Sequence, residues 1–199
     1  VTSDNGMAFP RAKANCFEFG FHVPLAIRWP AMDGAAGRQL DDLVSFVDIA
    51  PTLLEAAGVK VPAEMVGRSL MGIIKSRRDG QADRRRVAAY GARERHSSSR
   101  YGNLAYPQRA LRTHDYLLIH NFRPDRWPAG TPQKLNSDGT PGPMHGGYHD
   151  IDACPSLTFL IEGRQDPELS RFFHLAVDKR PEFELYDIRR DPGCLQNLY

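Results

Sequence analysis

The sequence predicts an α/β fold followed by a smaller C-terminal α+β subdomain with an antiparallel sheet. A short apolar run at residues 23–29 and a helical spacing in residues 43–57 indicate a strand and a helix in the first part. Two later runs, residues 108–112 and 116–121, flank a polar turn, as in an antiparallel hairpin. The charged, Gly-containing stretch 77–86 marks the predicted boundary, so the two parts are residues 1–80 and 81–199.

The first part begins with an element that we expect to lead into a functional loop. Residues 1–3 are predicted to be the tail of a central parallel strand, and the loop at 4–21 leaves its carboxyl end. Ligands bind at that end of the strands in open α/β sheets, and long ordered loops are more often functional. The run at 23–29 stops at Pro30 and is predicted to be a buried strand.

The pattern of residues 43–57 predicts a helix with recognisable ends. Asp48 is placed as its N-cap, with Pro51 in the first turn, where a missing N–H does no harm. Gly58 suits the position just beyond the last turn. A second, short helix is expected at residues 69–75, so this region is predicted to be scaffold.

The second part is predicted to mix strands, helices and one long loop. We expect strands at residues 87–92, 108–112, 116–121 and 183–188, helices at 155–163 and 167–175, and a loop at 122–153. The loop is rich in Pro, Gly, His and Asp. Its His145 and His149 lie four residues apart without a helical pattern, which favours a solvated or glycan-facing loop over a metal pair.

Composition limits the function more than it indicates one. The 199 residues are 41% hydrophobic and 25% charged, as in an ordinary globular protein, and the net charge of +2 gives no argument for nucleic acid. No run reaches the roughly 18 apolar residues of a membrane span. Three widely spaced cysteines fit no zinc pattern and leave one disulfide possible. The arginines between Arg77 and Arg126 form either a solvated face or a basic rim for a polyanionic substrate.

One stretch near the start of the chain combines groups that suit a bound anion and a metal ion. Asp4 and Asn5 offer oxygen ligands for a hard cation such as Ca²⁺. Gly6 permits a positive φ where the chain turns away, and Lys13 can hold the anion that the metal also holds. Asp-Asn-Gly is also a common solvated turn, so this stretch needs its context to be interpreted.

The context resembles the sulfatase family of the alkaline-phosphatase-like superfamily. The motifs that carry the resemblance are T-S-D-N-G at 2–6, V-P-L-A-I-R-W-P at 23–30, S-F-V-D-I-A-P-T-L-L-E-A-A-G at 45–58, G-R-S-L at 67–70 and E-L-Y-D at 184–187, followed by D-P at 191–192 and N-L at 197–198. P-R-A-K-A-N at 10–15 is most similar to the N-sulfoglucosamine sulfohydrolase (sulfamidase) branch. The resemblance implies that residues 1–80 are the C-terminal part of the family's α/β sandwich.

The resemblance also implies an activity and a set of site residues. The activity is hydrolysis of a sulfuric ester or sulfamate on a sulfated sugar, and the family is secreted, periplasmic or lysosomal. Asp4 and Asn5 match the family's Ca²⁺ ligands, and Asp4 also stabilises the nucleophile hydroxyl. Lys13 matches a cation that binds a sulfate oxygen, and Glu94 and His96 are expected to touch the sugar. His22 stands where many sulfatases have Arg, and a structural role is expected for it.

Part of the family's site has no counterpart in this sequence. The family makes a formylglycine nucleophile from a C/S-x-P-x-R motif, and Cys154-Pro155 lacks both the spacer and the Arg. Val1 is not a natural start, so we expect a C-terminal fragment whose nucleophile and paired Asp-Asp ligands lie upstream. We expect the 199-residue chain alone to hydrolyse nothing. Two alternatives stay open: a phosphonate or phosphate monoester hydrolase of the same superfamily, and a non-catalytic glycan-binding fragment.

Overall fold

The computed structural model describes residues 1–30, 37–96 and 101–199, which form two compact units. Unit 1 comprises Val1–Leu25, Gly91–Leu111 and Asp115–Tyr199, and unit 2 comprises Ala26–Tyr90 and Arg112–His114. The N-terminal loop therefore packs with the later part of the chain. A boundary between family domains at residue 80 stays a prediction.

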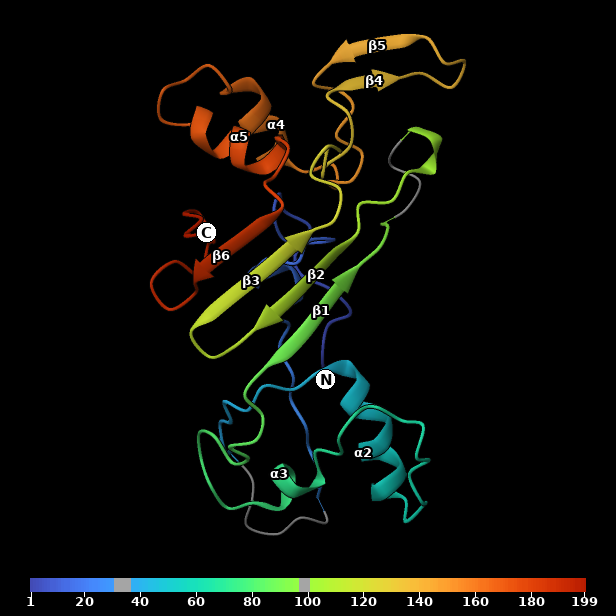
Figure 1. The fold of residues 1–199 in the computed structure, drawn as a ribbon, viewed down its shortest axis with the longest axis vertical. Coiled ribbons are helices and arrows are strands. Elements are labelled where there is room, and N and C mark those ends of the chain that lie inside the picture. The colour runs from blue at the N-terminus through green and yellow to red at the C-terminus, as the bar shows by residue number, and fades with distance from the viewer. Residues whose placement is uncertain (31–36, 97–100) are drawn as a thin grey trace. The chain divides into compact units, whose positions relative to one another are not determined.

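A four-stranded sheet with the strand order β1-β2-β3-β6 organises the later part of the chain (Figure 1). The strands are β1 (Ala89–Arg93), β2 (Gln108–Arg112), β3 (Tyr116–Asn121) and β6 (Phe183–Asp187). In the antiparallel pair β3 and β6, Leu117 lies opposite Tyr186. The predicted antiparallel sheet is confirmed, and β2 and β3 have the bounds that the apolar pattern indicated.

The main core of unit 1 lies against one face of this sheet. Leu117 and Ile119 are fully buried, whereas Tyr116, the first residue of β3, is exposed. Burial therefore alternates along β3, as expected for a strand with one buried face. The buried cluster consists of Cys16, Phe17, Ala110, Leu117, Ile119, Tyr186, Ile188 and Cys194. Phe17 belongs to the N-terminal loop, so the core joins that loop to the sheet.

A chain of buried polar groups crosses the sheet. The Gln108 amide donates to Asn121 Oδ1 at 2.7 Å, and the Asn121 amide donates to Glu184 Oε1 at 2.7 Å. The Tyr186 hydroxyl donates to the other Glu184 oxygen at 2.5 Å, and burial raises the pKa of Tyr186. Because buried polar groups need partners, these bonds favour one register of β2, β3 and β6.

Two helices and a short hairpin complete unit 1. The helices α4 (Pro155–Glu162) and α5 (Ser170–Val177) confirm the two predicted helices, and Pro155 occupies the first turn of α4. They pack in a second core of Ala129, Tyr148, Ile151, Phe173, Ala176 and Val177. The short elements α1 (Glu18–Phe21) and η2 (Tyr101–Asn103) were not expected from the sequence.

The hairpin lies inside the region that the sequence predicted to be a loop. Its strands are β4 (Gln133–Leu135) and β5 (Pro141–Met144), joined by a turn in which Gly139 has a φ of +82°. All three residues of β4 are exposed, so no apolar alternation marks the strand. Pro141 is compatible with this short ribbon because proline is tolerated on edge strands.

Unit 2 contains the predicted scaffold helix in a shorter form. The 3₁₀ turn η1 (Phe46–Asp48) precedes α2 (Ile49–Ala56), and α3 (Met71–Lys75) follows, as predicted. Gly58 has a φ of +70°, in agreement with its predicted place beyond the helix. Asp48 makes no side-chain N-cap hydrogen bond to α2. Its carboxylate instead accepts from the backbone N–H of Ser45 in a capping box that starts η1.

Two predicted strands do not form. Thr2 and Leu25 make an isolated antiparallel bridge, and neither residues 1–3 nor 23–29 belong to a named strand. Ile27 is 50% exposed. An apolar run becomes a buried strand only where other strands pair with it, and no strand of the described residues pairs with this run beyond the bridge.

Other properties of the chain follow from the described residues. No helix among them has the length and apolar character needed to cross a membrane. All three cysteines carry free thiols, and burial raises the pKa of both Cys16 and Cys194 to about 11. The two buried thiols are therefore protonated near neutral pH.

Candidate active site

The Asp-Asn-Gly turn is closed by hydrogen bonds that leave the Asp4 side chain exposed. The Ser3 hydroxyl donates to the carbonyl oxygen of Asn5 at 2.8 Å, and the Gly6 N–H donates to the Gly20 carbonyl at 3.0 Å. Gly6 does not have the positive φ that the sequence suggested. A Cβ at this position would lie 2.1 Å from the Phe19 carbonyl oxygen, so glycine is needed for close backbone approach.

We expect Gly6→Ala to lower the melting temperature of the protein substantially, because the added methyl would displace the backbone of residues 19–20. Gly72→Ala is the matched control: Gly72 lies within α3, and a Cβ there meets no atom within 4 Å. That control should be neutral or slightly stabilising. Thermal unfolding by circular dichroism measures both. Equal melting temperatures for the two variants would contradict the steric explanation.

The backbone on both sides of Lys13 is held in an uncommon conformation. Arg11 and Ala14 have φ angles of 64° and 60°, in the left-handed region that non-glycine residues rarely adopt. Such conformations cost of the order of 1 to 3 kcal/mol each and persist only where the surroundings enforce them. The loop around Lys13 is therefore constrained by contacts with the rest of unit 1.

Arg11 and Asn15 supply those contacts. The Arg11 guanidinium donates to the carbonyl oxygens of Leu175, at 2.8 Å, and of Cys194, and burial followed by the charge of Arg180 lowers its pKa. Arg180 donates to Asn15 Oδ1 at 2.9 Å, and the Asn15 amide donates to the Lys13 carbonyl oxygen at 2.9 Å. The chain positions on each side of Lys13 are thus tied to α5 and to residues near the C-terminus.

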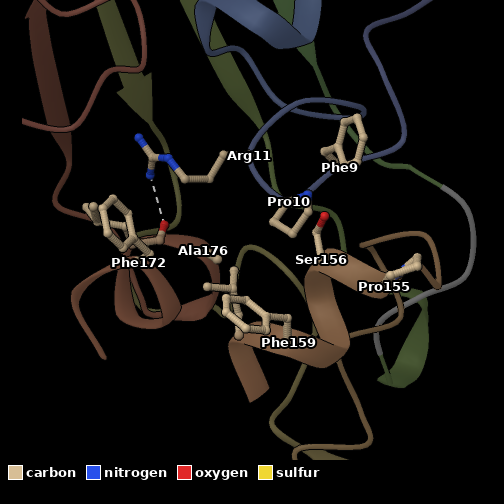
Figure 2. A pocket seen from close by; sticks show the side chains of 10 residues that line it. Phe9, Pro10, Arg11, Pro155, Ser156, Phe159, Phe172 and Ala176 are labelled. Atoms are coloured by element: carbon tan, nitrogen blue, oxygen red, sulfur yellow. Dashed lines mark hydrogen bonds between the residues drawn. The ribbon is translucent and has the colours of Figure 1, made fainter. Parts of the chain in front are cut away.

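Figure 2 shows a cavity beside this loop, with Arg11 reaching the last turns of α5. The cavity has a volume of about 560 Å³. Its lining is largely apolar, with Phe159 of α4 and Phe172 of α5 on its walls and Pro10 from the loop. None of the site residues predicted from the sequence lines it, so the cavity neighbours the candidate site without containing it.

Lys13 makes an ion pair with a residue that sequence analysis did not assign to the site. Its Nζ lies 2.6 Å from Oδ2 of Asp152, and the two side chains are 31% and 36% exposed. An ion pair with this much exposure contributes only about 0.2 to 1 kcal/mol to stability. The loop therefore fixes the position of Lys13, while the ion pair with Asp152 is weak and the ammonium stays accessible to solvent.

His96 is held by a carboxylate two residues before Asp152. His96 Nδ1 lies 2.9 Å from Oδ1 of Asp150, and the Arg93 guanidinium of β1 pairs with the other oxygen. The Asp150 side chain is 2% exposed and the His96 side chain is 34% exposed. Because Asp150 accepts at Nδ1, that nitrogen carries the proton in neutral His96.

The segment 150–152 therefore connects two predicted site residues that are 83 positions apart. Two residues of extended chain span at most about 7 Å, so the partners of Lys13 and His96 originate close together. Ile151 between them is buried in the second core, which fixes the segment. Lys13 and His96 thus have partners on the same short segment, and their membership of one site stays a prediction.

The remaining predicted residues take separate positions. Glu94 pairs with Arg109, and both side chains are about half exposed, so it lies at the surface beside β2. Asp4 and Asn5 begin the same loop as Lys13 but make no side-chain hydrogen bond with it. His22 pairs with Glu18 at 2.6 Å, and its structural role stays a prediction.

Asp4 and Asn5 fit a calcium ion only as part of a larger ligand set. Ca²⁺ takes six to eight oxygen ligands. Among residues 1–30, 37–96 and 101–199, no group of three His, Cys, Asp or Glu residues could hold a metal ion. The two adjacent oxygen donors suit the chemistry of the ion, and the rest of its ligands would have to come from elsewhere.

The sequence pattern did not reveal Asp150 and Asp152. Both lie in the aperiodic region 122–153, and their partners are 54 and 139 positions away along the chain. The region also holds His145, whose Nδ1 bonds the Tyr148 hydroxyl at 2.9 Å and whose pKa is lowered by burial.

The model of the family described as N-sulphoglucosamine sulphohydrolase, C-terminal, matches residues 12–135, more than half of the chain. An "Ulvan-active sulfatase" of Formosa agariphila is 29% identical over 98% of this chain and 28% of its own length. The human "N-sulphoglucosamine sulphohydrolase" is 25% identical over 99% of this chain and 36% of its own length. The chain thus spans about a third of these relatives.

A solved structure supports the fold. The structure of BT4656 in complex with its substrate D-glucosamine-2-N,6-O-disulfate matches 92% of this chain and 25% of that chain, with a TM-score of 0.55 and 21% sequence identity. At this identity the likeness concerns the fold alone, and it confirms the mixed helix and strand architecture. The two curated relatives are named as a sulfatase and a sulphohydrolase, so the comparisons give the phosphate or phosphonate ester alternative no support.

Proposed function

The chain belongs to the N-sulphoglucosamine sulphohydrolase, C-terminal, family, and from this membership we propose that the protein is a sulfatase acting on a sulfated sugar. The proposed reaction is hydrolysis of a sulfate ester or sulfamate, with glucosamine as the preferred sugar. A human relative named for N-sulphoglucosamine and a similarly folded protein that binds a disulfated glucosamine support this substrate class.

The observation that carries the proposal is the accessible Lys13 ammonium on a constrained loop, joined through residues 150–152 to His96. A fixed cation neutralises charge on a sulfate oxygen and so holds the anionic group where the nucleophile can reach it. An imidazole and a carboxylate both hydrogen-bond sugar hydroxyls, and His96 and Glu94 supply one of each close together in sequence. In this proposal, Lys13 binds the sulfate, and His96 and Glu94 orient the sugar.

Asp4 and Asn5 would hold Ca²⁺ together with ligands outside the described residues. When bound, the ion would supply positive charge to the sulfate oxygens. The family's formylglycine nucleophile would come from a segment that this sequence does not contain, since it has no C/S-x-P-x-R motif. The residues of this chain thus bind and orient the substrate.

The test is release of inorganic sulfate by the protein expressed from its complete gene. Glucosamine N-sulfate and glucosamine 6-O-sulfate are the substrates, and an aryl phosphate is the control. We expect sulfate from at least one of the two sugars and no phosphate. Phosphate release without sulfate release would overturn the proposal, and so would the absence of any hydrolysis by a folded protein supplied with Ca²⁺.

A further inference from the structure

The ion pair between Lys13 and Asp152 differs from the buried ion pairs of the molecule. The side chains of Asp48 and Arg86, and those of Asp150 and Arg93, are at most 7% exposed, whereas Lys13 and Asp152 are 31% and 36% exposed. The Asp152 carboxylate accepts a hydrogen bond from Lys13, and no other group among the described residues donates to this carboxylate. A pair so exposed is not needed to hold the fold.

We propose that Asp152 is an internal competitor for the sulfate at Lys13: its carboxylate occupies the lysine in the free protein and is displaced when a sulfated substrate binds. This inference rests on the proposed function and adds a regulating residue to the same site. A carboxylate and a sulfate oxygen are both anionic acceptors, and the compact Lys ammonium pairs with either as a point charge.

The backbone of Asp152 cannot move far when its carboxylate is displaced. Ile151 beside it is buried, and Asp150 is fixed by Arg93 and His96. The Asp152 carboxylate therefore stays close to Lys13 while the sulfate is bound, and its negative charge acts on the bound anion. The site therefore binds anions less tightly than it would if Lys13 were present without Asp152.

The repulsion depends on the charge of the anion. A sulfate monoester or a sulfamate carries one negative charge, whereas inorganic sulfate carries two near neutral pH. At a separation of about 5 Å in water-like surroundings, the repulsion corresponds to about a fourfold loss of affinity for each charge on the anion. Asp152 would thus weaken binding of the product more than binding of the substrate and so help the product to leave.

The test uses Asp152→Asn in the protein expressed from its complete gene. We expect the inhibition constant of inorganic sulfate to fall by about 15-fold, and the KM for sulfated glucosamine to fall by about fourfold. Asp152→Ala removes the same charge without adding a hydrogen-bond donor and should shift both constants in the same direction. Asp125→Asn is the matched control, because it also breaks an exposed ion pair, with Arg123, and changes the net charge equally.

Direct calorimetric binding of inorganic sulfate separates this inference from the proposed function. Tighter sulfate binding by both Asp152 variants, with Asp125→Asn unchanged, supports the competitor role even if no substrate is hydrolysed. Weaker or unchanged sulfate binding by both Asp152 variants would overturn it, since a residue that only orients Lys13 would lower affinity when removed. Hydrolysis of sulfated glucosamine by the wild type would still uphold the proposed function in that case.

Discussion

Replacing Lys13 by alanine should lower kcat/KM for sulfate release by about a hundredfold to a thousandfold, the range measured when one preorganised charge-stabilising group is removed from an active site. Stability should change little, because the Lys13 ion pair is about one-third exposed. Steady-state kinetics on sulfated glucosamine and thermal unfolding of the same samples measure the two effects.

Two further variants separate the role of the charge from a general effect of mutation. Lys13→Arg keeps a cation at the position and should retain much of the activity, although a planar guanidinium meets a sulfate differently from an ammonium. Lys134→Ala removes an exposed lysine from β4 and should leave both kinetics and stability unchanged. Full activity of Lys13→Ala would remove Lys13 from the site and leave the proposed mechanism without its sulfate-binding cation.

The effect should be large because the loop around Lys13 is constrained before any substrate arrives. The left-handed backbone at Arg11 and Ala14 and the anchors at Leu175 and Cys194 fix the position from which the lysine extends. A preorganised cation needs no reorganisation during the reaction. A lysine on a flexible loop would have to be ordered during the reaction, and its removal would cost less.

Local pattern was sufficient for most regular elements of unit 1. The residues of β3 alternate between buried and exposed positions, and α4 begins at a proline that suits a first turn, so both could be located without tertiary information. The run at 23–29 has the same apolar character as a strand but lacks pairing partners. Sequence pattern describes what a segment can bury, and the rest of the fold decides whether it is buried.

In the candidate site, too, some residues could be predicted from the sequence and others depend on tertiary packing. Lys13 lies in a family motif and His96 was expected from the family resemblance, whereas the contacts of Asp150 and Asp152 span 54 and 139 positions and involve a region without periodicity. Sequence analysis correctly singled out Gly6 but gave the wrong reason for it. Gly6 does not have a positive φ, and glycine is needed because a Cβ would collide with the Phe19 carbonyl oxygen. Such contacts arise only when distant segments pack.

Replacing Asp48 by alanine should destabilise unit 2 by about 3 to 5 kcal/mol, the usual cost of leaving a buried charge without its partner. The Asp48 carboxylate accepts from Arg86 at 2.6 Å, from the Arg68 N–H at 2.7 Å and from the Ser45 N–H at 3.1 Å. Its side chain is 7% exposed and that of Arg86 is 3% exposed. Hydrogen exchange of the α2 amides measures the loss within unit 2 itself.

The source of that loss can be identified with a double variant. If the unpaired Arg86 charge causes it, replacing both partners, as in Asp48→Leu with Arg86→Met, should recover most of the stability, because a buried ion pair and an apolar pair of similar volume are often equivalent.

Asp83→Ala is the control: it removes the carboxylate of an ion pair with Arg85 in the same unit and should have a much smaller effect, since the Arg85 side chain is 85% exposed. An unchanged α2 exchange rate in Asp48→Ala would contradict the prediction. A double variant as unstable as Asp48→Ala would instead assign the loss to the backbone N–H groups of Arg68 and Ser45, which need the carboxylate as their acceptor.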